Sequence, residues 1–410
     1  MRRCIALALL APLLCLFWQG EAQAETAKTV NCVYPGEVLA SALADFSTQL
    51  GYRFEPGDYE DSFEIEQPIW VLAKDVKPEL AARMIGASGG VQINLDDANR
   101  RITLTDLDSD EADARSVKGF KIDDLAAHFL AYQKRYGRVG DGTDPDLLYR
   151  PTATEELRDA ISEILRLEET EGGAGSAVGK RLIYTRSKTE LAQISELIQL
   201  LGTAAGGESA ALKLDRRNRD ELRKLRSDFQ PGDGLLSALL YQLFKDYSVP
   251  VYIDAGLMGQ FDFQYDTTEV TLEATSTHFD ALQALARENF FAVDSVGGAL
   301  RLNQQDYAGS ASYRVFAVSE LLVELEQAYT ELKTGEDVLE GFHGDLRSHG
   351  GVDVVIDALE LQLESAGHSP LIRAYGALVV VVGGVDVVDA GVEVLEAMGW
   401  KQAEANEEPK

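Results

Sequence analysis

Cysteine is nearly absent from this chain of 410 residues, which contains three. Two of them, Cys4 and Cys15, fall within the first 24 residues, and the third is Cys32. If the first 24 residues are removed, the one remaining cysteine cannot form an internal disulfide, so the fold cannot depend on covalent cross-links. We expect Cys32 to be a half-buried residue on a first strand, and a reactive thiol is the less favoured interpretation.

Long apolar runs are missing after residue 24. The longest, 377–382, suits a buried strand, whereas a membrane-spanning helix needs about 20 apolar residues. Near the start, Arg2 and Arg3 precede a short apolar stretch, and 22–24 (Ala-Gln-Ala) has the small-x-small pattern of a cleavage site. Residues 1–24 are therefore predicted to be a signal peptide, and we expect an exported, soluble protein of a Gram-negative-type periplasm.

Positive charge is scarce relative to negative charge. The chain has 38 Lys and Arg against 68 Asp and Glu, a formal net charge of −30. Such a field repels nucleic acids and anionic headgroups, so we expect neither nucleic-acid binding nor membrane insertion. The acidic residues are spread along the chain, as on a solvated surface, and 402–410 is predicted to be an acidic tail.

One basic island interrupts the acidic background, at 205–227. Leucines and acidic residues are interleaved with its lysines and arginines. The segment is predicted to be a charged linker that forms a solvated helix paired with acidic neighbours. Docking of an anionic partner is the alternative.

The sequence contains an internal repeat. A shift of 197 positions brings apolar residues at both ends of the chain into register: Leu39, Leu43 and Phe46 with Leu236, Leu240 and Leu243, and Leu191 and Leu197 with Val388 and Val394. Because one offset holds within a residue or two over a long span, we predict a duplication.

Each copy of the repeat divides into two halves. The first halves, 30–106 and 228–304, show a helix, two strands, a helix and a hairpin. The second halves, 115–204 and 312–401, show a strand, two helices, a buried strand and a last helix. The prediction is an α+β fold of four small modules in A-B-A-B order, each a small sheet packed with two or three helices.

The first halves resemble a known domain. The helices at 38–52 and 235–245, the second helices at 81–86 and 280–285, and the closing hairpins are similar to the short N-terminal domain shared by secretins and TonB-dependent transducers. The second halves resemble the small βαββα modules that follow this domain in secretins. The resemblance implies a module that docks envelope proteins of secretion, pilus or TonB-type machinery. It does not extend to the pore-forming part of secretins, so pore formation is not expected.

Two short motifs resemble known sites and are incomplete. Residues 175–181 are similar to a phosphate-binding loop but lack its leading glycine and the Ser or Thr after lysine, so a plain turn is predicted. Asp106, Asp108 and Asp110 match the first ligands of a calcium loop without its central glycine and final glutamate. An acidic linker at 106–114 is the favoured interpretation.

A third cluster, His343, Asp345 and His349, could supply metal ligands but has no counterpart in the first copy. What recurs between the copies is apolar residues and glycines, so we assign no catalytic, cofactor-binding or metal-binding residue and expect no cofactor. The predicted function is a non-enzymatic protein-interaction or scaffold role. The alternatives are a metal-dependent hydrolase that uses the 341–349 loop and a sensor of small ligands or peptides.

Overall fold

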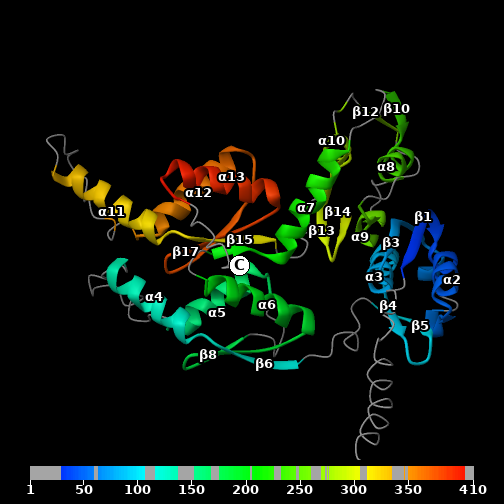
Figure 1. Ribbon diagram of the computed structural model, residues 1–410, viewed down its shortest axis with the longest axis horizontal. Helices are drawn as coiled ribbons and strands as arrows, with labels where there is room; N and C mark the ends of the chain where they lie inside the picture. The colour runs from blue at the N-terminus through cyan, green and yellow to red at the C-terminus, as the bar shows by residue number, and fades with distance from the viewer. Residues whose placement is uncertain are drawn as a thin grey trace, which may run out of the picture. The chain divides into compact units, whose positions relative to one another are not determined.

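The computed structural model is a mixed α+β protein, which confirms the predicted fold class (Figure 1). It forms two compact units: unit 1 combines Met1–Leu107 with Phe229–Ala274, and unit 2 combines Asp108–Asp228 with Thr275–Lys410. The division falls inside 228–304, so the two parts of this predicted domain belong to different units. The A-B-A-B order stays a prediction.

The structure describes residues 29–59, 63–106, 116–136, 152–167, 175–203, 206–225, 232–245, 249–259, 269–272, 275, 277–304, 312–334, 346 and 350–401. The predicted signal peptide, the acidic linker beyond Asp106 and the acidic tail lie outside these residues.

The described part of unit 1 contains four α-helices, and its strands pair in three groups. Its elements are β1 (Val30–Val38), α2 (Leu39–Leu50), β2 (Arg53–Glu55), short 3-10 helices at Gly57–Tyr59 and Phe63–Glu66, β3 (Pro68–Val76), α3 (Pro78–Gly89), β4 (Val91–Asp96), β5 (Arg101–Asp106), β10 (Gly232–Leu235), α8 (Leu236–Phe244), β11 (Val251–Ile253), α9 (Ala255–Met258) and β12 (Glu269–Leu272). β3 pairs antiparallel with β1 and with β11. The other sheet has the order β2–β5–β4, and β10 pairs with β12.

The helix α2 illustrates how the sequence specifies this unit. Leu39, Leu43, Phe46 and Leu50 recur at helical spacing and are all buried. The helix ends at Gly51, whose φ of +70° is a left-handed conformation that glycine adopts without steric cost. The predicted helix is therefore confirmed with its apolar face toward the core.

Cys32 lies on β1, as predicted, but it is fully buried and not half-buried. Burial, with a smaller effect of the Asp45 charge, raises the pKa of its thiol from 9.0 to about 12. Because the thiolate is the reactive form, we expect iodoacetamide to leave Cys32 unmodified in the native chain at neutral pH and to modify it in urea, as read by peptide mass spectrometry. Because folding raises this pKa, the buried thiol makes its full contribution to the free energy of unfolding below about pH 9. That contribution is lost as the pH rises toward 12. Rapid native labelling would contradict this burial.

Unit 2 is built in layers around two sheets (Figure 1). The sheets have the orders β16–β17–β15–β9 and β6–β8–β7. The elements are β6 (Ser116–Lys121), α4 (Asp123–Tyr136), α5 (Ala153–Ile164), β7 (Ser176–Val178), β8 (Arg181–Arg186), α6 (Lys188–Leu201), β9 (Gly206–Glu208), α7 (Ala210–Lys224), α10 (His278–Glu288), β13 (Phe291–Val296), β14 (Ala299–Gln304), β15 (Tyr313–Ala317), α11 (Ser319–Thr334), α12 (Asp353–Ser365), β16 (Leu371–Tyr375), β17 (Leu378–Val382) and α13 (Val385–Ala397).

The alternation of side chains along β17 explains the layers. Val380 belongs to the core that contains α4, α5 and α6, whereas Val379 and Val381 pack with α12 and α13. Successive side chains of a strand point to opposite faces, so an uninterrupted apolar strand suits a sheet covered on both sides. The segments 115–204 and 312–401 consequently share one hydrophobic core.

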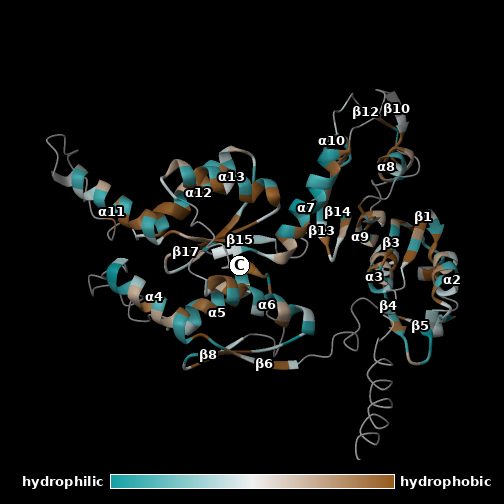
Figure 2. Cartoon of the chain, viewed as in Figure 1, coloured by the Kyte–Doolittle hydropathy of each residue, from teal (hydrophilic) through white to brown (hydrophobic). Residues whose placement is uncertain are grey.

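The basic island forms β9 and the helix α7. Figure 2 shows hydrophilic colours along most of this helix. The predicted helix and its ion pairs with acidic neighbours are confirmed, but the helix is not solvated throughout. Its buried residues include charged ones: Leu212, Asp215, Asn218, Arg219 and Leu222.

Ion pairs attach α7 to the rest of unit 2. The Arg219 guanidinium lies 3.0 Å from Asp215 and 2.5 Å from Asp386 on α13. Burial disfavours its charged form, but the two aspartates outweigh this effect and the pKa of Arg219 is raised. Arg216 adds two hydrogen bonds to Asp389, at 2.7 and 2.9 Å. A segment between the predicted repeats is thus part of the packed fold.

Candidate functional site

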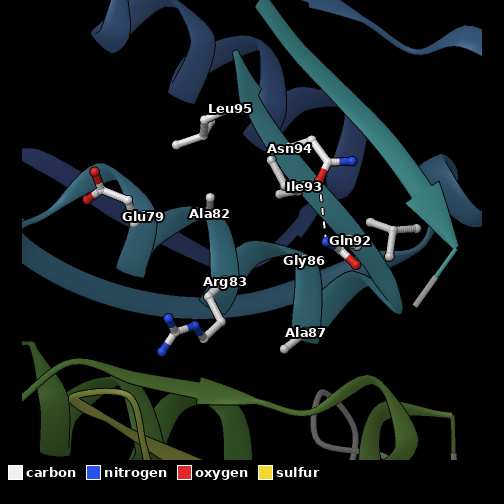
Figure 3. Close-up of a pocket in the computed structure, with 10 residues that line it drawn as sticks. Glu79, Ala82, Arg83, Gly86, Ala87, Gln92, Ile93, Asn94 and Leu95 are labelled. Atoms are coloured by element: carbon white, nitrogen blue, oxygen red, sulfur yellow. Dashed lines mark hydrogen bonds between the residues drawn. The ribbon is translucent and has the colours of Figure 1, made fainter. Parts of the chain in front are cut away.

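The candidate site is a groove on unit 1 between α3 and β4, with a volume of about 470 Å³ (Figure 3). The left-handed residue Gly90, at φ +70°, turns the chain so that β4 returns beside α3. The lining residues are Glu79, Ala82, Arg83, Gly86 and Ala87 from α3, and Val91, Gln92, Ile93, Asn94 and Leu95 from β4.

Small residues on α3 keep this groove open. Ala82, Gly86 and Ala87 line the groove, where larger side chains would fill the space. A Cβ atom added to Gly86 would lie 2.5 Å from the carbonyl oxygen of Val91, which is closer than real contacts allow. Helix and strand therefore approach each other at this glycine, and the apolar side chains of Ile93 and Leu95 remain only partly buried.

The strand β4 lies at the edge of its sheet, and α3 approaches the backbone of Val91 and Ile93. Among the described strands it pairs with β5 alone, in a register without a bulge. In an antiparallel pair, every second residue directs its backbone N–H and C=O away from the partner strand. Natural edges are usually protected by lysine, proline or a bulge, and 91–95 (Val-Gln-Ile-Asn-Leu) has none of these.

Polar groups border the apolar floor of the groove. Glu79 and Arg83 are exposed and lie one helical turn apart on α3. The amide of Gln92 donates to Asn94 Oδ1 at 3.3 Å, and Asn94 Nδ2 donates to Thr105 Oγ1 at 3.1 Å. Glu79 and Leu95 lie toward one end of the groove and Gln92 toward the other (Figure 3). This combination of apolar floor and charged rim suits a polypeptide segment.

Two smaller clefts adjoin in unit 2, each about 300 Å³ in volume, and both are lined by His128 and Ser319. Asp124 lies one turn before His128 on α4 and lines the first of them. An Asp, His and Ser set can support nucleophilic catalysis only when hydrogen bonds order it. In the described part of the chain no hydrogen bond joins any two of these three side chains, so the set is not assembled for that chemistry.

The motifs predicted from the sequence fall elsewhere. Residues 175–181 form the antiparallel hairpin of β7 and β8, which confirms the predicted turn. Asp106 ends β5, whereas Asp108, Asp110, His343, Asp345 and His349 lie outside the described residues.

The described residues contain neither a metal-binding cluster nor a membrane-spanning helix. No three His, Cys, Asp or Glu side chains there lie close enough to hold a metal ion. Across the same residues, no helix is both long enough and apolar enough to cross a membrane.

Sequence reasoning missed the groove. The signal that could have found it is the series of small residues Ala82, Gly86 and Ala87, followed after a turn by a strand without lysine or proline. Alanine and glycine also occur wherever a helix packs closely, so this pattern alone does not distinguish a groove from a filled core.

No family model matches the chain, and no curated protein matches it either. The resemblance to modules of secretins and TonB-dependent transducers therefore stays a prediction. The functional argument rests on the geometry of the groove.

Proposed function

We propose that the chain is a non-enzymatic protein-docking protein whose unit 1 binds a segment of a partner protein in the α3–β4 groove. The observation that carries this proposal is the groove between α3 and β4, with small side chains on the helix, the apolar side chains of Ile93 and Leu95, and a charged rim. A polypeptide segment can supply an apolar side chain for the groove and polar groups for its rim, as in many peptide-recognition modules.

The size of the groove supports an anchored segment. Its volume of about 470 Å³ falls among those of binding sites, which are roughly 300–1,000 Å³. Full burial of one Leu or Phe side chain there would contribute about 1.5–3 kcal/mol. A few such contacts suffice for a reversible interaction of micromolar affinity, which is about 8 kcal/mol.

The net charge of the chain favours cationic partner proteins. A net charge of −30 raises the rate of encounter with cationic proteins and opposes encounter with acidic ones. We place this docking in the periplasm, with envelope proteins of secretion, pilus or TonB-type machinery as partners, from the signal-peptide pattern and the family resemblance.

The proposal predicts that Ala87→Trp abolishes partner binding without unfolding unit 1. Ala87 is half-buried at the groove, so an indole ring there occupies the space of the partner. Crosslinking mass spectrometry in cells that express the chain should show at least a tenfold loss of crosslinks between the partner and residues of α3 and β4.

The matched control is Ala44→Trp, which adds the same side chain at an exposed position of α2 outside the groove. It should leave the crosslinks intact. Equal crosslinking by the two variants would show that the groove is not part of the docking surface. The lack of any crosslinked partner for the unmodified chain would refute the proposed function.

A further inference from the structure

We infer that the segment bound by this groove is a basic amphipathic helix, which lies across the end of the groove formed by Glu79 and Leu95. The inference rests on the proposed function and names the class of partner. Its support is a second helix, turn and strand in unit 2, which already carries such a helix.

The two helix–turn–strand segments correspond at a constant offset of 200 residues. In each, a helix is followed by a residue with positive φ and then by the first strand of an antiparallel hairpin; in unit 2, Asn289 stands between the helix and that residue. The corresponding pairs are the N-caps Lys77 and Thr277, the left-handed residues Gly90 (φ +70°) and Phe290 (φ +56°), and the strand starts Val91 and Phe291. The offset therefore matches Glu79 with Phe279 and Leu95 with Ser295.

The helix α7 covers the corresponding positions in unit 2. The Arg223 guanidinium lies 4.5 Å from the centroid of the Phe279 ring, and that of Arg219 lies 5.7 Å from it. At the strand, Ser295 Oγ donates to Asp215 at 3.1 Å. Phe279 and Ser295 are the counterparts of two residues that line the open groove of unit 1.

One face of α7 makes all these contacts. Its residues follow helical spacing at positions i, i+3, i+4, i+7 and i+8: Asp215, Asn218, Arg219, Leu222 and Arg223. Asn218 donates to Ser295 Oγ at 3.1 Å, and Leu222 is almost completely buried. The surface beside a helix and strand of this type therefore accepts a helix with two arginines one turn apart and a buried leucine.

The residues that differ between the two sites indicate which kind of helix the groove prefers. Glu79 stands where unit 2 has Phe279, so the arginines of an incoming helix would meet a carboxylate in place of a ring. Leu95 stands where unit 2 has Ser295, which donates to Asp215 of α7. We therefore expect the incoming helix to carry an apolar residue at the position that corresponds to Asp215. Arg83 lies one turn further along α3, and its positive charge disfavours basic residues there. The preference for basic residues is therefore confined to the Glu79 end of the groove.

The test uses a fluorescein-labelled peptide with the α7 sequence 209–226 and the change Asp215→Leu, titrated with the full chain. Fluorescence anisotropy should show saturable binding that Ala87→Trp removes. Glu79→Lys should weaken binding at least tenfold. The control Glu37→Lys, an exposed acid on β1 outside the groove, should leave it within twofold.

A charge exchange sharpens this test. A second peptide carrying Arg219→Glu and Arg223→Glu should bind the Glu79→Lys chain more tightly than the unmodified chain. Equal weakening by Glu79→Lys and Glu37→Lys would reveal general attraction to an acidic protein and overturn the inference.

Two further outcomes separate the inference from the proposed function. A peptide with Asn218→Pro cannot form the helix, so equal binding of that peptide would show an extended occupant on β4 and refute the helix while leaving the docking groove. If neither peptide binds, the inference fails, and the crosslinks of the Ala87→Trp chain decide the proposed function separately.

Discussion

Replacing Arg219 with leucine is expected to lower the free energy of unfolding of unit 2 by about 3–5 kcal/mol, the range for breaking a buried ion pair. Arg219 is 6% exposed and Asp215 only 2% exposed. Leucine would leave Asp215 charged and buried, with hydrogen bonds from neutral groups alone. Urea denaturation followed by tryptophan fluorescence measures the loss as a lower midpoint.

Arg223→Leu is the matched control on the same helix face. Both arginines stack on Phe279, but Arg223 and its partner Asp220 lie 3.5 Å apart with side chains 44% and 52% exposed. Solvent screens such a pair, so its loss should cost less than about 1 kcal/mol. Equal costs for the two variants would contradict the structure, whereas Arg219→Leu combined with Asp215→Leu should recover most of the stability.

The sequence predicts those elements that are specified by residues close together in the chain. The spacing of Leu39, Leu43 and Phe46 indicates α2, and the glycine that follows ends it. The sequence predicts two strands between the helices of 30–106 but does not place the second, β3, because its central residues, 69–73, form an unbroken buried run without alternation. Such a run fits a buried helix as well as a strand, and only the pairing with β1 and β11 decides between them.

The non-local features could not be read from the sequence. The apolar run at 377–382 indicated a buried strand, and β17 is one, but which segments cover its two faces depends on residues far away in the chain. The same holds for α7, because the acidic partners Asp386 and Asp389 of its arginines are more than 160 residues distant. The groove depends on a helix–strand distance fixed at Gly86, which no pattern of residue types specifies.

The shared core of unit 2 predicts that Tyr375→Ala destabilises 115–204 and 312–401 together, by about 3–5 kcal/mol, as for other large aromatic residues truncated in a core. Tyr375, on β16, is 2% exposed and stacks on Phe129 of α4 with ring centroids 4.7 Å apart. Its hydroxyl donates to the carbonyl oxygen of Ala153 at 2.9 Å. The truncation therefore empties a space that both segments line.

Hydrogen exchange distinguishes a shared core from separate modules. Tyr375→Ala should reduce the protection of amides in α4, α5 and α6 as much as in β15, β16 and β17, because the cavity opens into the core that these helices share with the strands of 312–401. Tyr375→Phe keeps the ring and removes only the hydrogen bond to the carbonyl of Ala153, so it should cost about 1 kcal/mol with the stacking intact. If exchange rises in 312–401 alone, the two segments fold independently, and the order of four separate modules predicted from the repeat would describe unit 2 better than one layered core does.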